Sequence, residues 1–398
     1  MLDELGLLGA LRQVTPPIRM LRIGRGPATL DVPLSERELE YCPRRERFDG
    51  LLQDAAREAG VSVCDRTAAS SLVVCSGRVV GVRLEGPAGT REVHADWVVG
   101  ADGRDSWLAR QVQAEEYLDY EAPRGMYWSY WDAPPAYGAS PDYPCGMYVA
   151  NRTGTVRVAF HTDHDQVLVG SLPERSQLGA WRQDPLGSLQ ADLAADPMLA
   201  SFTRGAPRAR VRGFIPKRYF LRRAVGPGWL LLGDAGVHKE FVTGDGMSEA
   251  LLQAKSASSA LLAGESAVMA WWRVRDRKAL PFFLFGKLQG APGAPSRLDA
   301  LVIAQAARCP ETTARFARSL THEISPLEVV GLARVLRWVG ARALSGQPGV
   351  LADLWRHSLV MRELQRTLAR DHTLAAEKPL VATGDRRQKQ LARASRPA

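Results

Sequence analysis

The segment Gly228–Met247 constrains the fold of this chain more than any other, and it reads GWLLLGDAGVHKEFVTGDGM. Its first part, Trp229–Leu232, is a short apolar run, which predicts a parallel strand covered on both faces. Gly233 and Asp234 end that strand, and the carboxyl end of a parallel strand is where ligands dock in open α/β sheets. The segment therefore predicts an α/β fold with an acidic side chain at the ligand-binding edge of its sheet.

The second part of the same segment predicts the start of a helix. Apolar residues recur after Asp245 and Gly246 with the i, i+3, i+4 and i+7 spacing of an amphipathic helix. These positions are Met247, Ala250, Leu251, Ala254 and later Leu261. A helix N-terminus with bare glycine backbone attracts phosphate and other electron-rich oxygens, because its N–H groups point outward and its dipole is positive there.

A second pattern of strand, acid and glycine lies upstream, at Trp97–Ser106. An apolar run ends here in Gly-Ala-Asp-Gly, and Ser106 is placed to cap the helix that follows. Taken alone, either segment is better explained by a tight turn with a solvated carboxylate. Together, with a β-rich stretch between them, the two segments are a far more specific signal of one α/β domain that carries an insertion.

At these residues the chain resembles the flavin-dependent aromatic hydroxylases of the p-hydroxybenzoate hydroxylase family. Their Asp-Gly motif is similar to Gly100–Ser106, and their Gly-Asp motif is similar to Gly233–His238 followed by Thr243–Met247. A third match, Pro43–Leu52, is similar to the family's Arg-x-x-Leu segment, which opens a helix beside the flavin. The resemblance covers most of residues 5–290 and implies an α/β, Rossmann-like domain that binds FAD and uses NAD(P)H.

The resemblance also implies which residues contact the cofactor. Asp234 would bind the ribityl hydroxyls, and the loop Gly244–Met247 would face the pyrimidine edge of the flavin, where negative charge develops on reduction. Arg45 would meet the pyrophosphate or the ribityl chain. Asp102 and Gly103 would lie near FAD and the nicotinamide path.

The full predicted cofactor-binding set is Arg45, Asp102, Gly103, Gly233, Asp234, Ala235, His238, Gly244, Asp245, Gly246 and Met247. We interpret His238 as a structural or flavin-shielding residue, with a proton relay as the alternative. No side chain is assigned a catalytic role, and no cluster has the spacing of a metal site. In the resembled enzymes NAD(P)H reduces FAD, and the reduced flavin uses O2 to oxygenate a small electron-rich molecule.

The chain departs from the family pattern in two places. It lacks the Gly-x-Gly-x-x-Gly turn that holds the pyrophosphate, and Gly24–Ala28, which is superficially similar, follows no apolar strand, so we interpret it as a turn. A β-α-β unit needs roughly 30 residues or more, so we expect this first unit to be missing from the chain. Either it is encoded in frame upstream of Met1, which we predict, or the chain is a truncated relative; without the unit we expect weak flavin affinity. Asp245 stands where a neutral residue is common, and an acid there would repel the reduced flavin anion unless it points to solvent.

The predicted organisation is an FAD-binding domain interrupted by a substrate domain. The predicted parts are the first FAD-binding segment at 1–113, an inserted antiparallel β-sheet substrate domain at 114–223, the second FAD-binding segment at 224–290, a C-terminal helical region at 291–385 and a basic, disordered tail at 386–398. Within the insertion, the side chains of Tyr127–Trp131 alternate between the two faces of a strand. A substrate-pocket wall and sheet packing explain these aromatic residues equally well.

Composition narrows the class of protein further. A length of 398 residues with 45% hydrophobic residues supports the core of two or three domains. Five cysteines without paired or metal-type spacing indicate reduced thiols in a cytoplasmic protein. No apolar run reaches the roughly 18 residues of a membrane span. The net charge of +9 is spread along the chain, so neither nucleic acid nor a membrane is an expected partner.

Three classes of function stay open at this point. The first is a flavin monooxygenase that hydroxylates an aromatic or polyketide-like molecule. The second is another FAD-dependent oxidoreductase of the same fold, such as a double-bond reductase or a halogenase, although Trp128–Trp131 is not the Trp-x-Trp-x-Ile-Pro segment of halogenases. The third is a cofactor-free remnant that acts as a binding protein, which the missing phosphate-binding turn favours.

Overall fold

The structure is a computed structural model that describes residues 2–370. Contacts within the chain define two compact units. Of the described residues, unit 1 holds those up to 59, 121–217 and 281–365, and unit 2 holds 60–120, 218–280 and those from 366 onward. The predicted basic tail at 386–398 lies outside the described residues.

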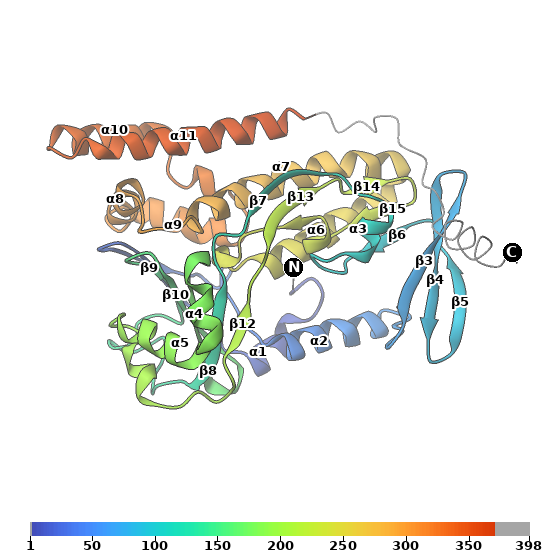
Figure 1. The fold of residues 1–398 in the computed structure, drawn as a ribbon, viewed down its shortest axis with the longest axis horizontal. Coiled ribbons are helices and arrows are strands. Elements are labelled where there is room, and N and C mark those ends of the chain that lie inside the picture. The colour runs from blue at the N-terminus through green and yellow to red at the C-terminus, as the bar shows by residue number, and fades with distance from the viewer. Residues whose placement is uncertain (1, 371–398) are drawn as a thin grey trace, which may run out of the picture. The chain divides into compact units, whose positions relative to one another are not determined.

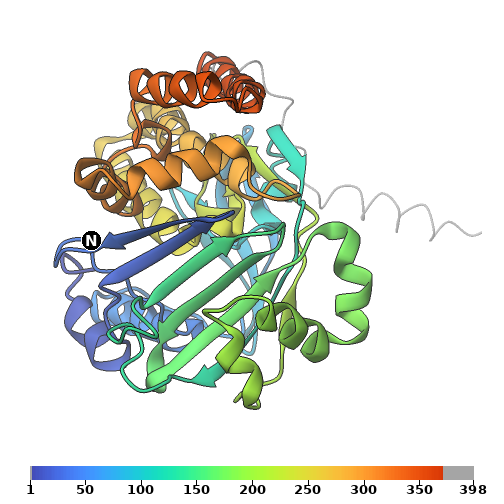
Figure 2. The same cartoon turned by 90° about the vertical axis from the view of Figure 1, so that its left-hand side faces the viewer.

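Unit 1 is built on a seven-stranded sheet with the order β12-β8-β11-β10-β9-β1-β2 (Figure 2). Its strands are β1 (Met20–Arg25), β2 (Ala28–Pro33), β8 (Met126–Asp132), β9 (Met147–Asn151), β10 (Val156–Thr162), β11 (Gln166–Leu172) and β12 (Arg212–Phe214). The antiparallel pairing of β8, β11, β10 and β9 confirms the predicted inserted sheet. Residues 20–33 extend this sheet, because β1 pairs in parallel with β9, although the sequence places them in the FAD-binding segment.

The two faces of this sheet pack against different helices. In β9, Tyr148 and Ala150 belong to a core shared with α4 (Leu178–Gln183) and α5 (Pro185–Ala194). Met147 and Val149, on the opposite face, pack against a core shared with α8 (Arg297–Ala306) and α9 (Pro310–Leu320). The sheet is therefore covered on both sides, as Figure 2 shows for its blue and green strands.

The aromatic run of β8 alternates between these two faces, as predicted. Tyr127 and Trp131 are buried in the core with α4 and α5, and the ring centroid of Tyr127 lies 5.1 Å from that of Trp181. Tyr130 lies on the other face, where the Arg44 guanidinium stacks 4.1 Å from its ring centroid. Packing therefore explains one face of the run, and only the other face stays a candidate pocket wall.

The remaining helices confirm the predicted helical regions. They are α1 (Leu8–Val14), α2 (Arg45–Glu58), α7 (Glu265–Gln289), α10 (Leu332–Leu344) and α11 (Gly349–Leu368). The turn between β1 and β2 confirms the interpretation of Gly24–Ala28, and Gly26 has the positive φ of 54° that such a turn favours in glycine. Among residues 2–370, no helix combines the length and apolar character that crossing a membrane requires.

Unit 2 holds three small sheets, labelled in Figure 1. One contains β14 (Val225–Gly226), β15 (Trp229–Leu231) and β6 (Val98–Gly100), a second contains β16 (Val237–His238), β13 (Arg218–Arg222) and β7 (Glu116–Glu121), and the third contains β3 (Ala68–Cys75), β4 (Arg78–Gly86) and β5 (Gly89–His94). β15 and β6 run parallel with Leu231 opposite Gly100, which confirms that the Trp229 segment is a parallel strand. Each leads towards a helix, β6 to α3 (Trp107–Gln111) and β15 to α6 (Gly246–Ala263).

Candidate functional site

Asp234 lies directly after β15, in the turn Gly233–Ala235, which confirms its predicted place at the end of a parallel strand. Its side chain is 45% exposed, and its Oδ2 lies 3.0 Å from His238 Nδ1. The His238 ring is buried in β16 beside Tyr219, and its Nε2 has no hydrogen-bond partner among residues 2–370. One carboxylate oxygen of Asp234 is thus oriented by His238, and the other can accept a hydrogen bond from a ligand hydroxyl.

The loop before α6 presents bare backbone. Gly244 adopts a left-handed conformation with φ 70°, and α6 begins at Gly246 as predicted. Both glycines are exposed, and a Cβ at either position would meet no atom within 4 Å. The first N–H groups of a helix have no partner within the helix, and the Asp245 side chain does not cap them. This end of α6 can therefore accept an electron-rich group of a ligand.

A buried chain of hydrogen bonds joins this loop to the turn that carries Asp234. Lys239 Nζ donates to Asp245 Oδ2 at 2.7 Å and to Glu249 Oε2 at 3.1 Å. Gln253 Nε2 donates to Glu249 Oε1 at 2.8 Å, and Gln253 Oε1 accepts from Gly233 N at 3.0 Å. The start of α6 and the Gly-Asp turn are therefore held as one piece by polar side chains.

Asp245 does not point to solvent, which the sequence analysis gave as the condition for an acid beside the reduced flavin. Its carboxylate is mostly buried, and the Lys239 ammonium compensates its charge. Burial lowers the pKa of Lys239, but Asp245 and Glu249 raise it by more, so the net direction is upward and the side chain stays charged. An acid at the start of α6 therefore does not by itself add net negative charge to this site.

The predicted apolar stripe of α6 is wrong in part. The buried positions of this helix are Glu249, Gln253 and Ala257, whereas Ala254, which the periodicity assigns to the core, is exposed. Polar side chains can be buried here because each has a hydrogen-bond partner, which offsets the cost of removing it from water.

Sequence reasoning missed Lys239, Glu249 and Gln253 as members of the site. Glu249 and Gln253 are four residues apart on one helix, a spacing at which side chains meet, and this was the one signal in the sequence. Lys239 lies in a short segment without periodicity, so nothing in the sequence distinguishes it from a surface lysine.

The second predicted acid, Asp102, is engaged in a different way. Its Oδ2 accepts hydrogen bonds from the backbone N–H groups of Trp107 at 2.6 Å and Leu108 at 3.2 Å. Ser106 Oγ accepts from Ala109 N at 3.0 Å, which confirms the predicted helix cap. Asp102 therefore stabilises the start of α3, while the adjacent Gly103 is a glycine with φ 76°.

Unit 2 holds ten of the eleven predicted cofactor-binding residues. It brings Gly233, Asp234, Ala235 and His238 together with the loop 244–247 through the contacts above, and β6 carries Asp102 and Gly103 at the end of the neighbouring parallel strand. Arg45 lies in unit 1 as the first residue of α2, where its Nε and Nη2 bind the Asp49 carboxylate at 2.8 and 2.9 Å.

Comparison with known proteins matches part of this chain to an FAD binding domain. Residues 1–131 match the family model described as FAD binding domain. A digeranylgeranylglycerophospholipid reductase from Methanopyrus kandleri is 28% identical over 245 residues, which cover 58% of this chain and 58% of that protein. The chain thus spans about three fifths of the length of the curated relatives it matches.

Solved structures share the fold at low sequence identity. The flavin-dependent brominase Bmp2 is 14% identical with a TM-score of 0.69, over 87% of each chain. The p-nitrophenol 4-monooxygenase PnpA from Pseudomonas putida is 14% identical with a TM-score of 0.63, over 81% of this chain and 85% of that one. The N-terminal third of the chain thus matches an FAD binding domain, and the chain shares its fold with flavin-dependent enzymes.

Proposed function

We propose that this chain binds FAD and oxygenates an aromatic or polyketide-like small molecule, with NAD(P)H as the reductant and O2 as the source of oxygen. The proposal rests mainly on the chain of buried hydrogen bonds that joins the turn of the half-exposed Asp234 to the open start of α6. Bound FAD would supply the redox chemistry, and the protein would supply binding, orientation and electrostatics.

Asp234, the start of α6 and Lys239 would each have a role in binding the flavin that their chemistry supports. Asp234 would accept hydrogen bonds from the ribityl hydroxyls, and His238 keeps its carboxylate in place. The first N–H groups of α6 would face the flavin ring, where the positive end of the helix dipole favours negative charge. Lys239 compensates the negative charges of Asp245 and Glu249, so these acids do not cancel the positive end of the helix dipole.

The residues fit the flavin end of FAD better than its pyrophosphate end. The sequence contains no Gly-x-Gly-x-x-Gly turn, and Arg45 is the only phosphate partner that the family resemblance assigns. Charge-assisted hydrogen bonds are each worth about 1.5–3 kcal/mol, so three missing contacts weaken binding by several powers of ten, at about 1.4 kcal/mol for each tenfold. We therefore infer that the chain binds FAD weakly.

Titration with FAD, followed by flavin fluorescence, tests this proposal. Asp234→Ala removes the expected acceptor and should weaken binding by about 1–3 kcal/mol, roughly tenfold to a hundredfold, because a charged hydrogen bond is lost. Asp105→Ala is the matched control, since Asp105 is an exposed acid of the same unit. Equal affinity of the Asp234 variant and the parent would show that Asp234 is only a turn residue, and no binding by the parent would favour the cofactor-free binding protein.

A double-bond reductase is the second candidate, supported by the name of the Methanopyrus kandleri relative. A halogenase is the third, supported by the fold of Bmp2 and opposed by the absence of the halogenase segment at Trp128–Trp131. The co-substrates separate the three, because oxygenation consumes O2, halogenation consumes O2 and halide, and double-bond reduction proceeds without O2. Product formation with NADPH under strictly anaerobic conditions would contradict the monooxygenase.

A further inference from the structure

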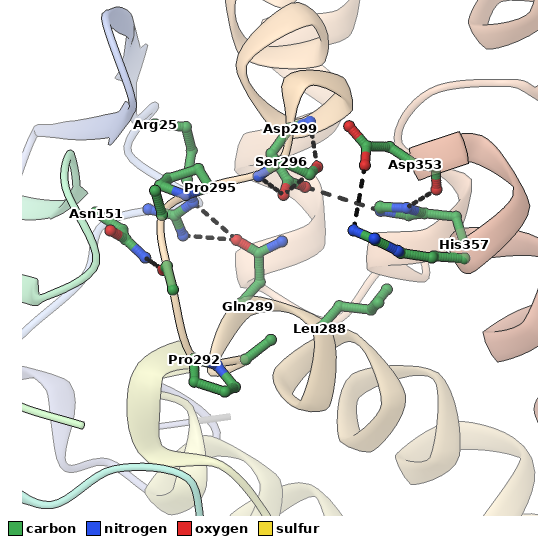
Figure 3. Close-up of a pocket in the computed structure, with 14 residues that line it drawn as sticks. Arg25, Asn151, Leu288, Gln289, Pro292, Pro295, Ser296, Asp299, Asp353 and His357 are labelled. Atoms are coloured by element: carbon green, nitrogen blue, oxygen red, sulfur yellow. Dashed lines mark hydrogen bonds and ion pairs between the residues drawn. The ribbon is translucent and has the colours of Figure 1, made fainter. Parts of the chain in front are cut away.

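Unit 1 contains a polar cavity that the proposed function does not use (Figure 3). Its volume is about 170 Å³, and its walls come from the end of β1, the loop 291–296 after α7, the start of α8 and α11. Pockets for drug-sized ligands measure about 300–1,000 Å³. This cavity therefore suits a small molecule or a single functional group of a larger one.

Arg25 occupies a position in this cavity where the strand pattern calls for an apolar side chain. In β1, Leu21 and Ile23 lie on the face that packs against the core with α8 and α9, and strand period two puts Arg25 on the same face. Arg25 is only 8% exposed. Burial lowers the pKa of its guanidinium to about 10, which leaves it charged at neutral pH.

The buried guanidinium has only neutral partners. Its Nε and Nη2 donate to Gln289 Oε1 at 2.9 and 2.6 Å (Figure 3). Its Nη1 donates to Gly24 O at 2.8 Å. A guanidinium has five N–H groups, and these meet two oxygens. Among residues 2–370 no carboxylate lies within ion-pair distance of Arg25. The edge formed by Nε and Nη2, which binds carboxylates and phosphates in a bidentate manner, is filled by one amide oxygen.

The acids that line the cavity are engaged elsewhere. Asp299 accepts from Ser296 Oγ at 2.7 Å in the capping box of α8. Asp353 pairs with Arg356 at 3.5 Å, and it also accepts from the backbone N–H of Arg297 at 3.0 Å. Asp299 favours the charged guanidinium through space, and Arg124 opposes it, but burial outweighs both effects on the pKa of Arg25. Neither acid forms an ion pair with Arg25 among residues 2–370, so the buried charge has no direct anionic partner of the kind that buried charges require.

The wall of the cavity is fixed rather than loose. Arg124 is fully buried and donates to the carbonyl oxygens of Gly290 at 2.9 Å and Ala291 at 2.7 Å. These carbonyls begin the loop that forms one side of the cavity, and Gly293 N is bound by Glu174 at 2.7 Å. These three polar contacts between distant segments therefore fix this wall of the cavity.

We propose that this cavity is a binding site for a small oxyanion, a carboxylate or phosphate group, that takes the place of the Gln289 amide oxygen on the Nε–Nη2 edge of Arg25. Arg356, whose side chain is 76% exposed, also lines the cavity and can supply further donors to the same group. The residues of this site all lie in unit 1, and none of them belongs to the predicted cofactor-binding set.

Calorimetric titration of the whole chain with inorganic phosphate and, separately, with benzoate tests the site. Saturable 1:1 binding of one probe is expected, and the preferred probe identifies the oxyanion as a phosphate or a carboxylate. Gln289→Glu places a carboxylate on Arg25 from within the protein, so it should weaken binding by about tenfold or more, equivalent to about 1.4 kcal/mol, while the melting temperature stays the same or rises. Arg25→Met should abolish binding.

The matched control is Arg57→Met, which removes an exposed arginine of the same unit and should leave affinity unchanged. Absence of saturable binding of both probes to the parent would overturn the proposal. Binding that survives Gln289→Glu would also overturn it, because the anion would then sit elsewhere, for example at the start of α6. FAD titration of Gln289→Glu separates the two sites, since its FAD affinity should equal that of the parent.

Discussion

The two strand-acid-glycine segments of unit 2 share a sequence pattern and use their acids for different purposes. Asp102 caps α3, which begins five residues later, and its carboxylate is occupied by backbone N–H groups. By contrast, α6 begins twelve residues after Asp234. Asp234 is therefore too far away to cap that helix, and its carboxylate stays half-exposed. The distance from the acid to the next helix thus separates a structural carboxylate from one that can bind a ligand.

The largest expected effect on stability comes from the buried ion pairs of Lys239 at the start of α6, where no side chain caps the helix. Lys239→Met leaves Asp245 and Glu249 without their shared cation, and removing one partner of a buried ion pair costs about 3–5 kcal/mol. The free energy of unfolding, measured by urea denaturation, should fall by that amount. Adding Glu249→Gln to this variant should recover part of the loss, because one uncompensated charge is removed.

Lys255→Met is the control for this experiment, since Lys255 is an exposed lysine on the same helix. Its effect should stay within about 0.5 kcal/mol, as for most surface substitutions. A loss below about 1 kcal/mol for Lys239→Met would be no larger than that of an average substitution. It would mean that the second segment does not depend on its buried charges, and it would contradict the comparison.

A smaller effect is expected in the first segment. Asp102→Ala removes the acceptor for two N–H groups of α3, and losing a helix cap costs about 0.5–2 kcal/mol. Thermal unfolding followed by circular dichroism would detect this. The neighbouring Asp105→Ala should have no effect, because the exposed Asp105 carboxylate binds the adjacent Arg104 side chain and caps no helix. Equal stability of Asp102→Ala and parent would show that Ser106 alone caps the helix.

The smallest effect on stability is expected for Asp234→Ala. Asp234 is half-exposed and bonds only His238, so we expect a change within about 0.5 kcal/mol in the free energy of unfolding, typical of surface positions. The same variant should lose FAD affinity, so the two acids should show opposite effects on stability and on binding. A stability loss for Asp234→Ala as large as that for Asp102→Ala would remove the distinction between them.

Much of the fold could be predicted from local pattern. The parallel strands, the helix at Gly246, the cap at Ser106 and the antiparallel insertion all depend on residues close in sequence. The attachment of residues 20–33 to the inserted sheet could not be predicted, because β1 pairs with a strand more than a hundred residues away. No periodicity within a segment specifies which distant edge it joins.

The candidate site was predicted less completely than the fold. Asp234 and the glycine loop follow directly from the strand and helix boundaries. The polar chain through Lys239 and Gln253 could not be predicted, because a buried polar residue is recognised by its partners and the sequence shows only its polarity. Arg25 could not be predicted for the same reason: it looks like part of a turn in the sequence, and in the structure it is buried with an amide and a backbone carbonyl as its hydrogen-bond partners.

Because β1 pairs with β9, the β1–β2 hairpin has to wait for its partner strand while the protein is being synthesised. The hairpin of β1 and β2 leaves the ribosome long before Asn151 completes β9, roughly 6 to 24 seconds at about 5–20 residues per second. Leu30 and Val32, which are fully covered in the folded protein, pack in the core with α8 and α9, which are made later still. The nascent chain therefore carries an early apolar hairpin that a ribosome-associated chaperone can bind before β9 is made.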